Sequence, residues 1–110
     1  MTKEQLSKLF HDTGCPVNEG VSSMKNEKTF PRIDYWEIAW EDVMASGSDY
    51  SEKVTWQIGF YAEIPRHPAL INLRETLRAM GLHPMIIHEF NTEDRIWHSY
   101  FSLETDGEKI

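Results

Sequence analysis

Residues 51–64 have the sequence SEKVTWQIGFYAEI, in which an apolar residue stands at every second position from Val54 to Ile64. Strict alternation of this kind is typical of a β-strand with one buried face. At about 3.3 Å per residue this strand would be about 45 Å long, whereas a compact domain of this size has a diameter of roughly 34 Å. We therefore expect either a β-bulge that bends the strand, with Gly59 as the candidate, or a hairpin that extends beyond the domain.

An aromatic and β-branched segment, RIDYWEIAW over residues 32–40, precedes this strand and predicts another strand, apolar on both faces. Alternation assigns one face to Trp36, Ile38 and Trp40 and the other to Ile33, Tyr35 and Ala39. Residues 41–50, EDVMASGSDY, then predict a flexible turn region that is long for a hairpin. The apolar pair Val43 and Met44 inside this polar region favours contact with a partner protein.

Two helices are expected on either side of these strands. Thr2 and Gln5 have the spacing of a capping box, and the apolar residues that follow predict a helix over residues 3–13. Pro68 is suited to a first helical position, and leucines at helical spacing after it predict a second helix that ends at Gly81. Residues 14–29 predict a connecting segment, with a short strand as one option.

Residues 85–90 and 95–103 form two further apolar stretches, separated by the turn-forming cluster Asn91–Asp94, and predict a closing hairpin. The element order is then α-β-β-α-β-β. We expect an α+β fold with a mainly antiparallel four-stranded sheet and two helices packed on one face, in one domain over residues 1–110 with a frayed end at 106–110. The helices have too few apolar residues to cover both sheet faces, so a second subunit is expected to cover the other.

Composition excludes several classes of function. The chain has 110 residues and a net charge of −7, which opposes the phosphate neutralisation on which nucleic-acid affinity depends. It has one cysteine, Cys15, so it forms no internal disulfide, and it contains no apolar run long enough for a signal peptide or a membrane span. We expect no sequence-specific nucleic-acid partner, no membrane partner and synthesis in the cytoplasm.

No residue pattern dictates a chemical reaction. His83, His88 and His98 lie near Glu89 as metal ligands would, but pairing Asn91 with Asp94 in the closing hairpin places His88 and His98 on opposite faces. We therefore predict no metal, no cofactor and no catalytic residue. Were the chain a small-ligand enzyme, its pocket would be expected around His88, Arg95 and Trp97.

The chain resembles a known group of proteins in four successive segments. These are the leading helix, FPRIDYWEIAWEDVMASGSDYSEKVTWQIGFYAEIP over residues 30–65, the leucine-spaced helix, and the closing HSYFSLE over residues 98–104. In length and layout the chain is similar to the small tail-completion proteins of long-tailed bacteriophages and prophages, the tail terminator and tail-to-head joining group. The resemblance covers roughly residues 2–105 and includes no catalytic motif.

The resemblance implies an α+β protein that assembles as a ring, usually a hexamer, at the end of the tail tube. Such a ring stops tube growth and provides the surface to which the head connector docks. The implied partners are other copies of the chain, the tail-tube protein and the head–tail connector, and the implied location is the host cytoplasm during assembly and then the virion. An acidic ring would also let DNA pass through its lumen without binding it.

Under this hypothesis two groups of residues form the interface with the ring or the tube. The group in the loop consists of Val43, Met44, Ser46, Gly47, Ser48 and Asp49. The group in the strand before the loop consists of Trp36, Ile38 and Trp40. Two other classes remain open. A small acidic binding module of regulatory or immunity type would share these features as a monomer or dimer, and an enzyme would need the pocket described above.

Overall fold

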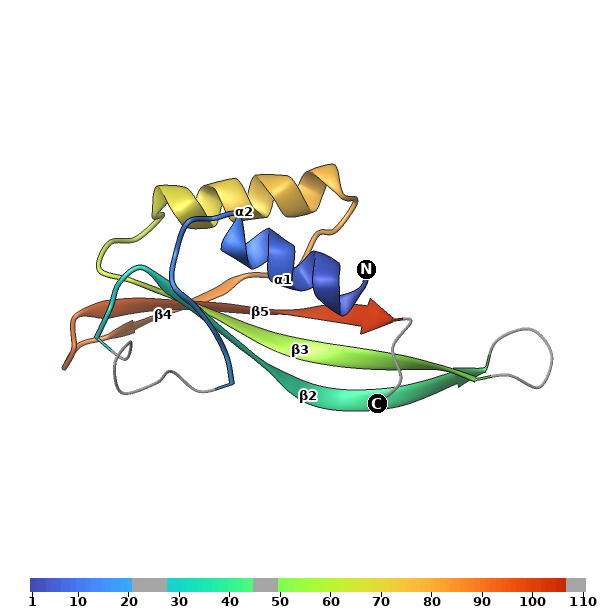
Figure 1. Ribbon diagram of the computed structural model, residues 1–110. Coiled ribbons are helices and arrows are strands. Elements are labelled where there is room, and N and C mark those ends of the chain that lie inside the picture. The colour runs from blue at the N-terminus through green and yellow to red at the C-terminus, as the bar shows by residue number, and fades with distance from the viewer. Residues whose placement is uncertain (21–27, 45–49, 107–110) are drawn as a thin grey trace.

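A five-stranded sheet carries two helices on one of its faces (Figure 1). The computed structural model describes residues 1–20, 28–44 and 50–106. In chain order the elements are α1 (Lys3–His11), β1 (Val17–Glu19), β2 (Arg32–Met44), β3 (Tyr50–Ala62), α2 (Pro68–Ala79), β4 (Ile87–Asn91) and β5 (Ile96–Asp106). The strands lie in the order β1-β2-β3-β5-β4.

The α+β class and the position of both helices on one face are as predicted, but the strand count is not. The three-residue β1 adds a parallel strand beside the start of β2, in the register Val17↔Ile33, so the sheet is mixed and has five strands. The order is α-β-β-β-α-β-β rather than α-β-β-α-β-β. A strand of three residues is too short to show an alternating pattern, which explains why the sequence indicated it only as an option.

Both helices begin at the predicted residues. The Thr2 hydroxyl accepts from the Gln5 backbone N–H at 3.2 Å while the Gln5 side chain accepts from the Thr2 N–H at 2.8 Å, which completes the capping box. α2 begins at Pro68, and Gly81 follows its end with a φ of +79°, a conformation that favours glycine. α1 ends at His11, slightly before the predicted end. Neither helix of the described ranges is long and apolar enough to cross a membrane.

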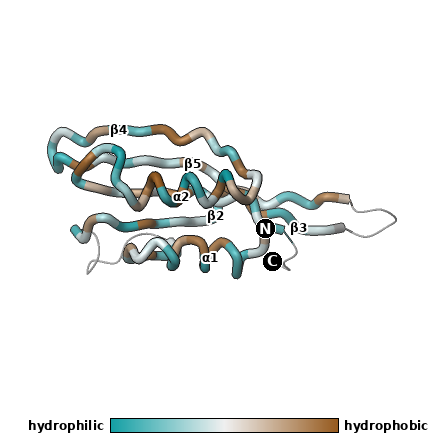
Figure 2. Tube along the Cα trace, turned by 90° about the horizontal axis from the view of Figure 1, so that it is seen from above, coloured by the Kyte–Doolittle hydropathy of each residue, from teal (hydrophilic) through white to brown (hydrophobic). Residues whose placement is uncertain are grey.

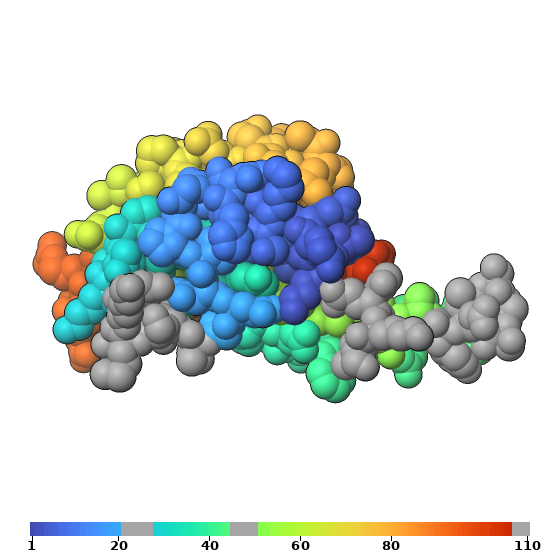
Figure 3. Space-filling view, viewed as in Figure 1, coloured from blue at the N-terminus to red at the C-terminus, as the bar shows by residue number. Residues whose placement is uncertain are grey.

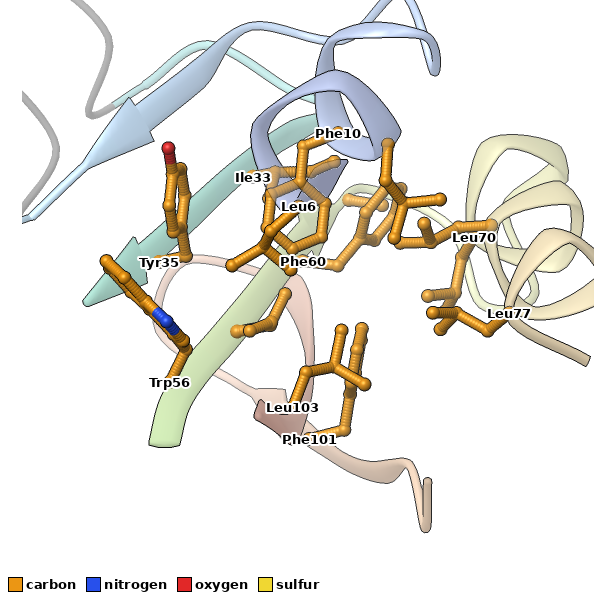
Figure 4. Packing of buried hydrophobic residues seen from close by; sticks show 14 of the residues in the cluster. Leu6, Phe10, Ile33, Tyr35, Trp56, Phe60, Leu70, Leu77, Phe101 and Leu103 are labelled. Carbon is orange, nitrogen blue, oxygen red and sulfur yellow. The ribbon is translucent and has the colours of Figure 1, made fainter. Parts of the chain in front are cut away.

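The hydrophobic core fills the space between the helices and the sheet (Figure 4). Trp56, Phe10 and Phe60 are its largest fully buried side chains. Tyr35 lies between two of them, with ring centroids 5.0 Å from Phe10 and 5.3 Å from Trp56. The helices contribute three residues each to this core: Leu6, Leu9 and Phe10 from α1; Leu70, Leu73 and Leu77 from α2.

We call the sheet face under the helices the helix-side face and the opposite one the open face. The open face bears mostly polar side chains, as strand alternation requires once the other face is apolar. Arg32 is buried there beneath two rings, with its guanidinium 4.9 Å from Phe30 and 4.2 Å from Tyr61 and an ion pair to Asp34 at 3.5 Å. The ring of His98 stacks on Tyr61 at 4.3 Å.

The first hairpin is longer than predicted. β2 continues to Met44 and β3 begins at Tyr50, so residues 41–44 are strand and not turn. Val43 and Met44 pair with Ser51 and Tyr50 and do not lie in a loop. Backbone pairing across the hairpin explains the extension, because it satisfies the polar groups of both strands regardless of side-chain polarity.

A β-bulge is present, but in β2 and not at Gly59. The register shifts between Glu37 and Ala39, and Ile38 is the extra residue, whereas Gly59 pairs regularly with its neighbours on both sides. The prediction that Trp36, Ile38 and Trp40 share a face is therefore wrong. Trp36 opposes Gln57 on the open face, while Trp40 opposes Val54 on the helix-side face.

Gly59 has a different role, which is to leave room for a neighbouring ring. A Cβ atom at this position would lie 3.0 Å from His98 Nε2 and 3.2 Å from the Tyr61 ring. The stack of His98 on Tyr61 therefore occupies space that any other residue at position 59 would fill.

The closing hairpin forms as predicted but in another register. Asn91 pairs with Ile96, which sets His88 opposite Ser99 and His98 opposite Glu89. The two histidines still lie on opposite faces, because the register differs from the predicted one by an even number of residues.

Candidate protein interface

The hairpin of β2 and β3 extends beyond the helices and gives the molecule an elongated shape (Figures 1 and 3). Its principal extents are 52 × 30 × 22 Å and its radius of gyration is 15.1 Å, against about 13 Å for a compact chain of this length. We call residues 37–44 and 50–55 the arm. The sequence left a bulge and a protruding hairpin as alternatives, and the structure has both.

The arm exposes large apolar side chains that the core does not cover. Trp40 is 63% exposed and Met44 64%, and Ile38 and Val43 are also exposed. Figure 2 shows the arm reaching past both helices. Each such side chain would contribute about 1.5–3 kcal/mol if a partner buried it fully, so together they form a strong candidate interface.

The register of the hairpin separates these residues by face. Trp40 and Met44 oppose Val54 and Tyr50 on the helix-side face, whereas Val43 opposes Ser51 on the open face. Because the bulge at Ile38 shifts the alternation, the helix-side face of the arm carries two of the most exposed apolar side chains.

Acidic residues flank the apolar ones on the same face. Asp42 opposes Glu52 between Trp40 and Met44. Glu37 lies nearer the core and accepts a 2.8 Å hydrogen bond from the Trp40 indole Nε1, which fixes the orientation of that ring. This face of the arm is therefore apolar and negatively charged.

The cation on the arm, Lys53, is directed to the open face. Its ammonium is 2.9 Å from Glu104 of β5, and this hydrogen-bonded pair raises the pKa of Lys53. Lys53 therefore does not neutralise the helix-side face.

The predicted interface residues are brought together only in part. Ile38, Trp40, Val43 and Met44 belong to the arm, whereas Trp36 is half-buried on the open face. Ser46, Gly47, Ser48 and Asp49 lie outside the described residues.

The alternative pocket around His88, Arg95 and Trp97 does not assemble as predicted. His88 and Trp97 line a cavity of about 240 Å³ beneath the start of α2, but Arg95 lies exposed in the β4–β5 turn with a φ of +56°. The sequence did not indicate that Ser99 would lie 2.6 Å from His88 Nδ1. Ser99 is 3% exposed, so a substrate has little access to its hydroxyl.

A larger cavity of about 740 Å³ lies on the open face, next to the stack of Arg32, Tyr61 and His98. Burial lowers the pKa of His98 and raises that of Tyr61, so both rings are neutral near pH 7. Because Arg32 already occupies the position between the rings of Phe30 and Tyr61, the cation site of this aromatic cluster is filled by the chain itself.

Metal ligands do not gather in the described part of the chain, where no group of three or more His, Cys, Asp or Glu side chains is positioned to hold an ion.

No known protein family matches the sequence, and no curated protein is significantly similar to it.

Proposed function

We propose that this chain is a structural protein of phage or prophage tail assembly, which forms an oligomeric ring that ends the tail tube and joins the tail to the head. The observation that carries this proposal is the arm, a paired hairpin that extends beyond the core with Trp40 and Met44 exposed. A protein that acts alone gains nothing from this arrangement, whereas a subunit of a larger assembly buries it.

The construction of the arm favours a docking role. Strand pairing holds it in shape before any partner arrives, so little conformational entropy is lost on assembly. The acidic balance of the chain fits a ring through which DNA passes, since like charges repel. The helix, hairpin, helix, hairpin layout is that of the tail-completion proteins that the sequence resembles.

A small acidic binding module of regulatory type is the second candidate, because the same arm would serve to bind one partner. The two candidates differ in self-association and in affinity for the tail tube. The ring protein forms closed oligomers or is recruited to tube ends, and the binding module does neither.

The test is native mass over a concentration series, with and without purified tail-tube protein of the same phage or prophage. We expect a closed ring of about six copies, or recruitment onto tube ends. Met44→Lys should abolish either result. Met80→Lys is the matched control, because Met80 is also an exposed methionine but lies at the end of α2. A chain that stays monomeric and ignores the tube contradicts the proposal.

A further inference from the structure

A second apolar surface lies away from the arm, in a groove of about 560 Å³ between α2 and the segment that leads into β4. Its apolar lining comes from Leu70 and Ile71 of α2 and from Pro84 and Ile86 before β4. Ile71 is 44% exposed, on a helix that buries three leucines against the core. We call this surface the α2–β4 groove.

The charge of the groove is opposite to that of the whole chain. Arg66 and Arg74 line it, and none of the described carboxylates does, in a protein with a net charge of −7. Arg66 makes no ion pair within the described ranges. Arg74 has one long contact, 3.5 Å to its sequence neighbour Glu75. The groove therefore offers two cations above an apolar floor.

The helix-side face of the arm has the complementary pattern. Trp40 and Met44 supply apolar side chains, and Glu37, Asp42 and Glu52 supply negative charge around them. Matching an apolar centre with opposite charges at its rim gives both affinity and orientation at protein interfaces.

The arm cannot reach the groove of its own chain. Figure 2 shows the arm extending past the ends of both helices, while the groove lies beside the sheet edge formed by β4. Both strands of the arm are continuous with the core sheet, so the arm has no hinge at which to fold back.

We propose that the arm of one copy docks in the α2–β4 groove of the next, with Trp40 and Met44 against Ile71 and Asp42 near Arg66. This inference rests on the proposed ring and identifies the two surfaces that join its subunits. The surfaces are different and do not overlap, so every copy donates one arm and accepts another. Such a contact is heterologous, and repetition produces a ring when the rotation between copies closes.

Crosslinking between two single-cysteine variants tests the contact directly. Met44→Cys and Ile71→Cys are each made in a Cys15→Ser chain, mixed in equal amounts under the conditions in which the protein assembles, and treated with a short bismaleimide. We expect crosslinked dimers that join position 44 to position 71. The control replaces Ile71→Cys with Ser102→Cys, because Ser102 is exposed on the open face of β5 and should give no link.

Charge reversal gives an independent readout. Asp42→Arg and Arg66→Asp should each weaken self-association by about tenfold or more, because each brings like charges together in the contact. Arg66 has a φ of +51°, a conformation that aspartate tolerates better than most residues, so the fold should survive the change. An equimolar mixture of the two variants should assemble, since alternate contacts then pair the new arginine with the new aspartate and the native Asp42 with the native Arg66.

The outcomes separate this inference from the proposed function. Oligomers that form without a 44–71 link, and that are indifferent to both charge reversals, overturn the inference and leave the ring intact. Recruitment onto tube ends of a chain that does not self-associate, abolished by Met44→Lys, would show that the arm docks on the tube and not on a second copy, and would also overturn it. Monomers at every concentration, with or without the tube, contradict both.

Discussion

The indole Nε1 of Trp56 donates a 2.8 Å hydrogen bond to the hydroxyl of Thr105, and both residues are 1% exposed. The bond joins β3, at the point where the arm leaves the core, to the end of β5. Thr105→Val should cost about 1–3 kcal/mol of unfolding free energy, because it leaves a buried N–H without an acceptor. Urea denaturation measures the change.

A Trp56→Phe chain allows the contribution of this hydrogen bond to be measured separately from that of packing. With the indole N–H removed, Thr105→Val should be nearly neutral, since no donor is then left unpaired. An equal cost in both backgrounds would show that the threonine acts through packing and not through the hydrogen bond.

Stability should fall as the pH is lowered through the range in which His98 would ordinarily titrate. Burial is the main cause of its lowered pKa, Arg32 adds to it, and Glu89 and Asp34 partly oppose it. Because the folded state binds a proton less readily than the unfolded chain, the unfolding free energy is largest above about pH 6.5 and decreases below it. Urea denaturation at pH 7.5 and 5.5 measures the difference.

His98→Gln should reduce that difference between the two pH values, because the substituted side chain does not titrate. His83→Gln is the control, since it removes an imidazole that lies away from this stack, in the segment before β4. If both variants behave like the original chain, His98 does not contribute to the acid sensitivity.

Gly59→Ala should destabilise the fold by about 1–3 kcal/mol, because the new Cβ would meet His98 Nε2 at 3.0 Å and force the stacked ring to move. In a His98→Ser chain the same change should cost much less, since the ring is absent. The double-mutant cycle measures this coupling, and a coupling of zero would exclude the ring as the reason for glycine.

Substitutions at two residues of α2 should distinguish an effect on stability from an effect on self-association. Leu73 is 2% exposed, and Leu73→Ala should cost about 2–5 kcal/mol. Ile71→Ala should change stability by no more than about 0.5 kcal/mol, because the side chain is exposed, but it should weaken self-association if the groove receives the arm. Urea denaturation measures the stability of each variant, and native mass measures the self-association of the same samples.

The elements with a long repeating pattern could be predicted from the sequence. The alternation from Val54 to Ile64 identified β3, which ends at Ala62, and the spacing of Leu70, Leu73 and Leu77 identified α2 with its proline start. These patterns extend over many residues, so one irregular position does not obscure them.

Features that depend on pairing between strands could not be predicted from the sequence in the same way. The bulge at Ile38 follows from how β2 pairs with β3, and no local signal in RIDYWEIAW indicates it. The α2–β4 groove was missed because Arg66 and Ile86 come together only after the sheet has formed. The proximity of His88 to Ser99 depends on a hairpin register that the turn sequence suggested incorrectly.

The bulge also determines the direction in which subunits could join. Deleting Ile38 would remove the bulge, but Trp40 would still oppose Val54 and Met44 would still oppose Tyr50, so both would stay on the helix-side face. A subunit carrying that deletion would keep nearly the same composition and the same contact residues on the same face, yet its arm would point in another direction, because a bulge bends its strand and increases the local twist. A single backbone residue thus decides whether two versions of this protein are compatible in one assembly, without any change in the chemistry of the surfaces that meet.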